Sequence, residues 1–218
     1  MASEAAPSQA ARSRGGEEAS RPARVGILAL QGDVRPHAEA VRAVGAEPVL
    51  VRLPRDFAAL DALILPGGES TTIRRLIDAY GLREPIAAMA RSGAPMLGTC
   101  AGMILLADRI EDGDEAVLSL IDIKVRRNGY GRQLDSFEAA VEMPALGDAP
   151  LHGIFIRAPI VTAVGPKAEI LARDADGRPI AVRQGRVLAT AFHPELTDDR
   201  RLHRLLVSLI GTRIGRAA

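Results

Sequence analysis

The only cysteine of this chain, Cys100, lies between two glycines in the run Gly98-Thr99-Cys100-Ala101-Gly102. An apolar, strand-like segment (residues 94–97) precedes the run, and a helix-like segment (residues 103–107) follows it. A strand that turns sharply into a helix around one reactive side chain is the layout of a nucleophile elbow. Such a turn exposes that side chain beside free N–H groups at the start of the helix, where negative charge is stabilised. Although a lone cysteine is more often a small buried apolar residue, the flanking glycines favour a nucleophile.

Composition excludes several classes of function. The 218 residues contain 28 Lys and Arg against 27 Asp and Glu, so no strong field points to nucleic acid or to an acidic membrane surface. No apolar run approaches the roughly 20 residues that span a bilayer. A single cysteine excludes an internal disulfide and fits a reducing compartment, which predicts a cytoplasmic protein. No cluster of side chains has metal-ligand spacing, so neither a metal nor an organic cofactor is expected.

The pattern along the chain predicts one domain and a tail. Residues 1–23 lack apolar periodicity and are predicted to be a disordered N-terminal tail, while residues 24–218 are predicted to form a single domain. Short apolar strands at residues 25–30, 48–53, 62–65 and 94–97 alternate with amphipathic helices, which predicts a mostly parallel sheet covered on both faces. The second half contains seven strand-like segments from residue 117 to residue 192, which are expected to extend and edge that sheet. Ser70 is the expected cap of one helix, and Thr197 or Asp198 the cap of the last.

A cysteine nucleophile needs a base, and His193 is the best candidate among the four histidines (His37, His152, His193 and His203). It lies in His193-Pro194-Glu195, directly after a predicted strand. If the backbone stays extended through Pro194, the side chains of His193 and Glu195 project to the same side. Glu195 would then orient the imidazole, which is the third role in a catalytic triad. Taken alone, however, this tripeptide is more often an ordinary loop.

Together these residues resemble the class I, triad-type glutamine amidotransferases, and most closely their subfamily of glutaminase subunits of pyridoxal 5′-phosphate synthase. Six segments between residues 25 and 210 carry the resemblance, in the same order as in the family. The cysteine turn and the His-x-Glu motif are shared by many amidotransferases, whereas three other segments are specific to the subfamily. The six segments are residues 26–32, 65–72, 98–102, 127–133, 155–159 and 192–196. One departure lies in the segment from Gln31 to His37, where Asp33 and Pro36 stand where the family has Ala or Asp and then Glu.

The resemblance implies a flavodoxin-like three-layer α/β fold with an antiparallel extension in its second half. It implies hydrolysis of L-glutamine to glutamate and ammonia by Cys100, His193 and Glu195. Arginine suits the planar α-carboxylate of glutamine, and Glu69 suits its ammonium group. Without the resemblance, the arginines would be interpreted as surface charges or members of structural ion pairs, and Glu69 as part of the first turn of a helix. The implied glutamine-binding residues are Gly68, Glu69, Ser70, Arg132, Ile156 and Arg157, and the implied oxyanion hole consists of Gly67, Gly68 and Ala101.

The resemblance also implies a partner. Ammonia would pass to a separate pyridoxal 5′-phosphate synthase subunit, a (β/α)₈ barrel that at about 250 residues does not fit within this chain. We expect docking to order the Gly67-Gly68 peptide, so that the lone subunit is weakly active.

Three other interpretations remain open at this point. The chain could serve another synthase, such as imidazole glycerol phosphate synthase. It could be a cysteine hydrolase for a substrate other than glutamine, or a binding subunit without activity. The presence of Cys100, His193 and Glu195 together weighs against the last.

Overall fold

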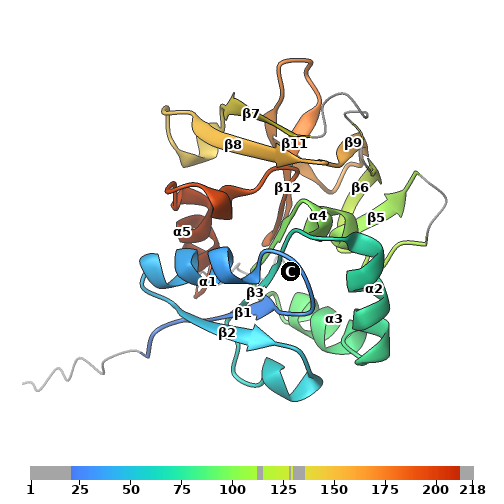
Figure 1. The fold of residues 1–218 in the computed structure, drawn as a ribbon, viewed down its shortest axis with the longest axis vertical. Coiled ribbons are helices and arrows are strands. Elements are labelled where there is room, and N and C mark those ends of the chain that lie inside the picture. Colours follow the sequence, from blue (N-terminus) through green and yellow to red (C-terminus); the bar gives the residue numbers. More distant parts are fainter. Residues whose placement is uncertain (1–20, 112–114, 128, 130–135, 212–218) are drawn as a thin grey trace, which may run out of the picture.

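The computed structural model describes residues 21–111, 115–127, 129 and 136–211, and a seven-stranded sheet forms the centre of this part (Figure 1). Its strands lie in the order β10-β11-β12-β4-β3-β1-β2. The strands from β12 to β2 are parallel, and β11 and β10 continue the sheet with antiparallel pairing. The bounds are β1 Arg24–Leu28, β2 Glu47–Val51, β3 Ala62–Leu65, β4 Met96–Thr99, β10 Glu169–Arg173, β11 Pro179–Gln184 and β12 Val187–Thr190.

The three middle strands explain why the sheet is parallel. Every residue of β3, β4 and β12 is buried, and continuous apolar runs of this kind are typical of strands that are covered on both faces. The side chains of β3 alternate between two cores: Ala62 and Ile64 belong to one, and Leu63 and Leu65 to the other. The predicted mostly parallel sheet is confirmed.

Helices cover both faces of this sheet and complete the three predicted layers (Figure 1). On one face lie α1 (Val34–Ala43) and α5 (Arg201–Ser208), and on the other lie α2 (Ser70–Ala79), α3 (Arg83–Arg91) and α4 (Ala101–Leu106). None of the helices in the described ranges is long and apolar enough to cross a membrane.

The second half of the chain departs from the prediction. Only β10, β11 and β12 extend the central sheet, whereas the other strands form a three-stranded sheet (β5-β6-β9) and a two-stranded sheet (β7-β8). Strand β5 was not predicted, because it follows α4 directly without turn residues, and β6 begins four residues later than expected. The bounds are β5 Ala107–Ile110, β6 Ile121–Arg126, β7 Ser136–Val141, β8 Leu151–Ile156 and β9 Ile160–Val164, with short 3₁₀ helices η1 Pro54–Phe57, η2 Pro144–Leu146 and η3 Pro194–Leu196.

The start of α5 also differs from the prediction of a cap at Thr197 or Asp198. The helix begins after Arg200, and no side chain of that residue caps it. The Asp199 carboxylate instead accepts the N–H of Arg201, at 3.0 Å.

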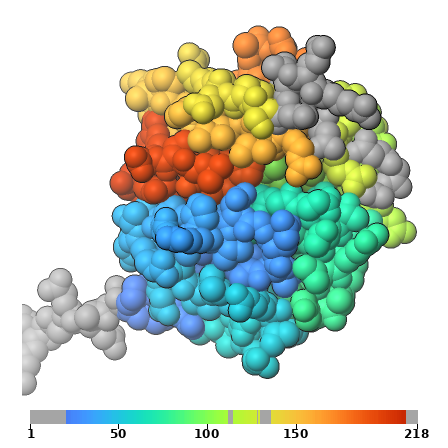
Figure 2. Space-filling view, viewed as in Figure 1, coloured from blue at the N-terminus to red at the C-terminus, as the bar shows by residue number. Residues whose placement is uncertain are grey.

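The described part of the chain begins at Arg21 and ends at residue 211. Of the predicted tail, residues 1–20 lie outside the described ranges. Arg21 forms an ion pair of 2.8 Å with Asp61, directly before β1 begins at Arg24. In the space-filling view, the surface of α1 adjoins that of the C-terminal segment (Figure 2).

Candidate active site

Cys100 occupies the turn between β4 and α4 with a backbone of φ 50° and ψ −105°. A positive φ is strained for residues other than glycine, and strain at a strand-to-helix turn is typical of a nucleophile elbow. The flanking glycines permit the close approach of neighbouring groups. A Cβ on Gly98 would lie 2.6 Å from the backbone of Gly102, and one on Gly102 would lie 2.0 Å from the oxygen of Leu65. The predicted strand–turn–helix arrangement is therefore present.

Hydrogen bonds tie the cysteine turn to neighbouring segments. The Cys100 N–H donates to the Thr190 carbonyl at the end of β12, at 2.8 Å. The thiol donates to the carbonyl of Ile156, with 3.6 Å between sulfur and oxygen. Since β4 and β12 are adjacent parallel strands, their carboxyl ends meet at this point, where open α/β sheets bind ligands.

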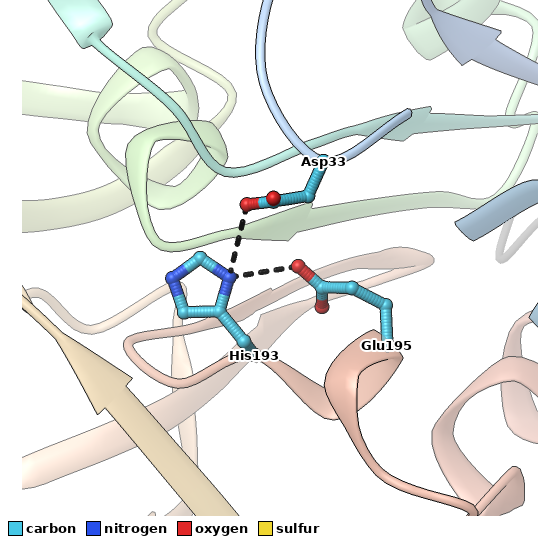
Figure 3. Close-up of side chains that lie close together, drawn as sticks. All are labelled: Asp33, His193 and Glu195. Carbon is cyan, nitrogen blue, oxygen red and sulfur yellow. Dashed lines mark hydrogen bonds and ion pairs between the residues drawn. The ribbon is translucent and has the colours of Figure 1, made fainter. Parts of the chain in front are cut away.

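His193 and Glu195 meet by a route that the sequence did not predict. The backbone does not stay extended through Pro194, because that residue begins η3; the fixed φ of proline suits the first position of a helix. This tight turn brings Nδ1 of His193 to 2.8 Å from Oε1 of Glu195 (Figure 3). The backbone N–H of His193 donates to the Ile154 carbonyl at 2.9 Å, which anchors the segment to β8.

The surroundings of His193 favour its charged form. Burial alone would lower the pKa of this ring, but the nearby side chains of Cys100 and Glu195 raise it to about 10. Burial would likewise raise the pKa of Glu195, yet contacts with His37 and His193 outweigh it, and the pKa of this carboxyl is lowered. The pair is therefore an imidazolium bound to a carboxylate. The Nε2 atom makes no hydrogen bond to another described group, so it is available to a substrate.

A second carboxylate, that of Asp33, also faces His193. Its Oδ2 lies 3.5 Å from Nδ1, the ring nitrogen that Glu195 also contacts (Figure 3). Asp33 is about one-third exposed, whereas Glu195 is buried. From the sequence, Asp33 was noted only as part of a segment that departs from the family pattern, and no role in the site was predicted for it.

A cavity of about 240 Å³ connects these groups. Pockets for drug-sized ligands measure about 300–1,000 Å³, so this cavity suits a smaller molecule. Eight of the residues predicted for the site line this cavity, whereas Gly67 and Glu195, which were also predicted, do not. Arg132 lies outside the described residues. The cavity is lined by the predicted residues Gly68, Glu69, Ser70, Cys100, Ala101, Ile156, Arg157 and His193, and by Asp33, Ile104 and Arg127, which were not predicted.

Glu69, not Ser70, caps the start of α2. Its carboxylate accepts the backbone N–H groups of Thr71 at 3.3 Å and of Thr72 at 2.8 Å. Partial burial would raise the pKa of Glu69, but the bonds from Thr72 and Thr71 outweigh it, and the pKa is lowered. Glu69 is thus a negative charge held in place at the cavity.

The Gly67-Gly68 peptide lies beside His193 and Gln31. Gly68 has a φ of 147°, and a Cβ at this position would lie 2.5 Å from Oε1 of Gln31. The Gly67 carbonyl accepts the N–H of Asp33 at 3.2 Å. Because the peptide is trans, its own N–H, that of Gly68, points the opposite way from this carbonyl.

Two arginines line the cavity. Arg157 was predicted, and its backbone has an unusual φ of 43° directly after β8. Arg127 was missed as an individual residue, although it begins a segment that carries the resemblance. Its guanidinium donates to the hydroxyl of Thr71 at 3.2 Å.

Asp33, His193 and Glu195 are also close enough to be considered as metal ligands. Each offers one atom, and these atoms lie within 4.8 Å of one another. Both carboxylates already contact the ring: Nδ1 of His193 hydrogen-bonds Glu195 at 2.8 Å and lies 3.5 Å from Asp33.

A larger concavity lies elsewhere and does not change the choice of site. It measures about 720 Å³ and is lined by residues 90–94 and 184–187 with Ser119 and Leu120. These residues precede β4 or surround the start of β12, so they lie at the amino ends of the central strands, away from Cys100.

The doubly wound sheet, with a strained cysteine and a histidine–glutamate pair at the carboxyl ends of adjacent strands, is the arrangement of a cysteine-dependent α/β amidotransferase. Comparison with known proteins narrows this class. The model of the SNO glutamine amidotransferase family matches residues 27–211. The chain belongs to this family, which confirms the predicted glutamine amidotransferase.

Individual relatives agree with the family match. The chain is 56% identical over 187 residues to the pyridoxal 5′-phosphate synthase subunit PdxT of Desulforudis audaxviator, covering 86% of this chain and 98% of that protein. It is 53% identical to the protein of the same name from Chloroflexus aurantiacus, over 85% of this chain and 99% of that one. A crystal structure of a glutamine amidotransferase superposes with a TM-score of 0.81 at 46% identity, covering 86% of this chain and 98% of the other.

Proposed function

We propose that this chain is the glutaminase subunit of a pyridoxal 5′-phosphate synthase and that it hydrolyses L-glutamine with Cys100, His193 and Glu195. The observation that carries the proposal is that Cys100, on its strained turn, shares one cavity with a histidine held at 2.8 Å by a buried carboxylate. We assign the activity to a single amidotransferase domain over residues 24–218.

In the first half of the proposed reaction, Cys100 has already given its thiol proton to Nε2 of His193, and Sγ attacks the side-chain amide carbon of glutamine. The amide oxygen takes up the negative charge and faces the N–H groups of Ala101 and Gly68. As the first residue of α4, Ala101 has no acceptor for its N–H within the helix. His193 then protonates the leaving nitrogen, the C–N bond breaks, and ammonia departs from a glutamyl thioester.

In the second half, water attacks the thioester carbon and gives a proton to His193. The C–S bond breaks, glutamate is released with the proton of its new carboxyl group going to solvent, and the Cys100 thiolate and the His193 imidazolium are restored. Glu195 keeps Nδ1 of His193 protonated throughout, so that Nε2 is the atom that exchanges protons.

The lining of the cavity supports glutamine as the substrate. Arg157, with Arg132 from outside the described residues, would bind the α-carboxylate, because guanidinium groups match planar oxyanions. Glu69 and Ser70 would meet the α-ammonium, and Ile156 would pack against the side chain.

Ammonia that escapes into water is lost to synthesis, so we propose that it passes to a separate synthase barrel subunit. The relatives' name supports pyridoxal 5′-phosphate synthase over the alternative, imidazole glycerol phosphate synthase. Docking would set the Gly67-Gly68 peptide and so complete the oxyanion hole. A cytoplasmic location is part of the proposal, because a free catalytic thiol needs a reducing compartment.

Glutamate release by the purified chain tests the proposal, measured alone and with either barrel subunit. We expect strong stimulation by the pyridoxal 5′-phosphate synthase barrel and none by the imidazole glycerol phosphate synthase barrel. The proposal is wrong if the chain releases no glutamate in any mixture.

A further inference from the structure

Behind Glu195, away from the cavity, lies a chain of buried polar side chains that the proposed reaction does not use. Nε2 of His37 lies 3.5 Å from Oε2 of Glu195 and 3.1 Å from the hydroxyl oxygen of Thr99. Nδ1 of His37 lies 3.1 Å from Nε2 of His203. The exposed fraction of each of these four side chains is 3% or less, so water does not satisfy them.

The chain joins four elements of the fold. His37 comes from α1, His203 from α5, Thr99 from the end of β4, and Glu195 from η3. On the surface, α1 and the C-terminal segment are adjacent (Figure 2). Burying two imidazoles costs free energy unless their ring nitrogens are paired, so their placement directly behind a triad carboxylate calls for a role.

Both rings are neutral, because burial lowers the pKa of His37 and lowers that of His203 to about 3. A neutral imidazole carries one N–H and one bare nitrogen, and its neighbours decide which is which. The ionisable groups that face the two rings from the elements packed against them are Glu195, His193, Asp33 and Arg200.

The contacts select one tautomer for each ring. If Nε2 of His37 were bare, its lone pair would face the ionised carboxylate of Glu195, and the two would repel. With the proton on Nε2, His37 directs an N–H toward Thr99 and Glu195, and its bare Nδ1 accepts from Nε2 of His203. Nδ1 of His203 is then the bare atom, which agrees with its having no hydrogen-bond partner among the described residues.

Glu195 needs this donor. Its Oε1 accepts from His193, but its buried Oε2 makes no hydrogen bond to another described group within ordinary limits. The Nε2–H of His37 is the donor that faces Oε2, at 3.5 Å. With His193 bound to Oε1 and the N–H of His37 facing Oε2, rotation of the carboxylate away from the imidazole that it orients is opposed.

We propose that His37 is a positioning residue for the glutaminase triad: His203 fixes its tautomer, and its Nε2–H holds Glu195 in place to orient His193. The inference rests on the proposed function, because it assigns a role within that triad. It extends the Cys100–His193–Glu195 set by two buried histidines that do not touch the substrate.

Two substitutions at one position separate positioning from packing. His37→Gln keeps an N–H donor near the place of Nε2, whereas His37→Leu fills the space without a donor. Both lose the bond to His203, so a merely structural role would affect both variants alike. With the barrel subunit present, we expect kcat for glutamine hydrolysis to fall about 10–100-fold in His37→Leu, by analogy with the loss when an outer-shell partner of a metal-binding imidazole is removed. We expect His37→Gln to recover most of that loss, with KM unchanged in both variants.

Alkylation of Cys100 by iodoacetamide provides a readout that needs neither glutamine nor a partner. Cys100 is the only cysteine in the sequence, so the label is unambiguous. A loosened Glu195 weakens proton binding by His193, so the rate in His37→Leu should be lower at neutral pH and its pH profile should move upward. Val41→Ala, a buried apolar change on the same helix, is the matched control and should leave the profile in place.

The outcomes separate this inference from the proposed function. If the wild-type chain is alkylated normally but releases no glutamate with the barrel, the proposed function fails, and alkylation still decides the role of His37. Equal alkylation profiles for His37→Leu and wild type overturn the inference. Should His37→Leu not fold, nitrogen-15 NMR of the wild-type ring decides: a proton on Nε2 and a bare Nδ1 support the inference, and the reverse overturns it.

Discussion

The two carboxylate oxygens of Glu195 face two different regions of the molecule: the cavity with Cys100, and a buried pair of histidines. In front, Oε1 meets His193, which lines the cavity beside Cys100. Behind, Oε2 faces His37, which is enclosed with His203 between α1 and α5. Each region contains buried histidine, yet the pKa of His193 is raised to about 10 and that of His203 is lowered to about 3.

The comparison teaches that burial does not decide which imidazole is charged. Burial lowers the pKa of both rings, and the neighbours make the difference. His193 lies beside the side chains of Glu195 and Cys100, which favour its cation, whereas His203 faces another imidazole and Arg200, which do not. One buried carboxylate thus separates a reactive region from a neutral supporting one.

The largest effect is expected at the nucleophile, Cys100, which lies in the cavity region. Cys100→Ala removes the sulfur that forms the thioester, so glutamine hydrolysis should fall by about 10⁴-fold or more. Glutamate release in the presence of the barrel subunit measures the loss. A variant with the original rate would contradict the cysteine mechanism.

The next largest effect is expected at Glu195, which lies between the two regions. Glu195→Gln preserves the shape but loses the charge that holds the proton on Nδ1, so kcat should fall by about 10²–10⁴-fold while KM changes little. Steady-state kinetics with the barrel subunit provides the measurement. If KM rose instead and kcat held, Glu195 would belong to substrate binding.

A smaller effect is expected where the front region meets the substrate. Arg157→Gln removes a charge-assisted bond to the proposed α-carboxylate, commonly worth about 1.5–3 kcal/mol, so KM for glutamine should rise about 10–100-fold. Glutaminamide, which lacks this carboxylate, serves as the control substrate. Its hydrolysis should respond much less to the substitution, and an equal response would place Arg157 outside carboxylate recognition.

The smallest effect is expected behind Glu195, on stability. Because the folded pKa of His203, about 3, lies below its unfolded value of 6.5, the unfolded chain binds the proton first as pH falls. This histidine therefore contributes to the free energy of unfolding above pH 6.5, and the contribution is lost between pH 6.5 and about 3. Between pH 7 and pH 5, the protonation of His203 should lower the free energy of unfolding by about 2 kcal/mol.

Urea unfolding of wild type and His203→Leu at both pH values tests this effect. The variant should lose less stability on acidification than the wild type does. Identical losses would show that folding does not lower the pKa of His203.

The front region could be predicted from sequence far better than the region behind it. The glycines around Cys100 mark a turn by their local pattern, and continuous apolar runs mark the buried strands. His193 and Glu195 are two residues apart, so their pairing was found even though the expected backbone was wrong. His37 and His203 are 166 residues apart, and no local pattern indicates that they meet. Asp33 was missed for the same reason, since its contact with His193 depends on how β1 and β12 are placed in the sheet.

Nitrogen-15 NMR titration of the four histidines tests the contrast between the two regions most directly. The account predicts that His193 stays protonated through neutral pH and loses its proton near pH 10, while His203 stays neutral until about pH 3. In Cys100→Ala the midpoint of His193 should fall, because one of the groups that raises it is gone. Two rings that both titrate near their ordinary pKa of 6.5 would contradict the account.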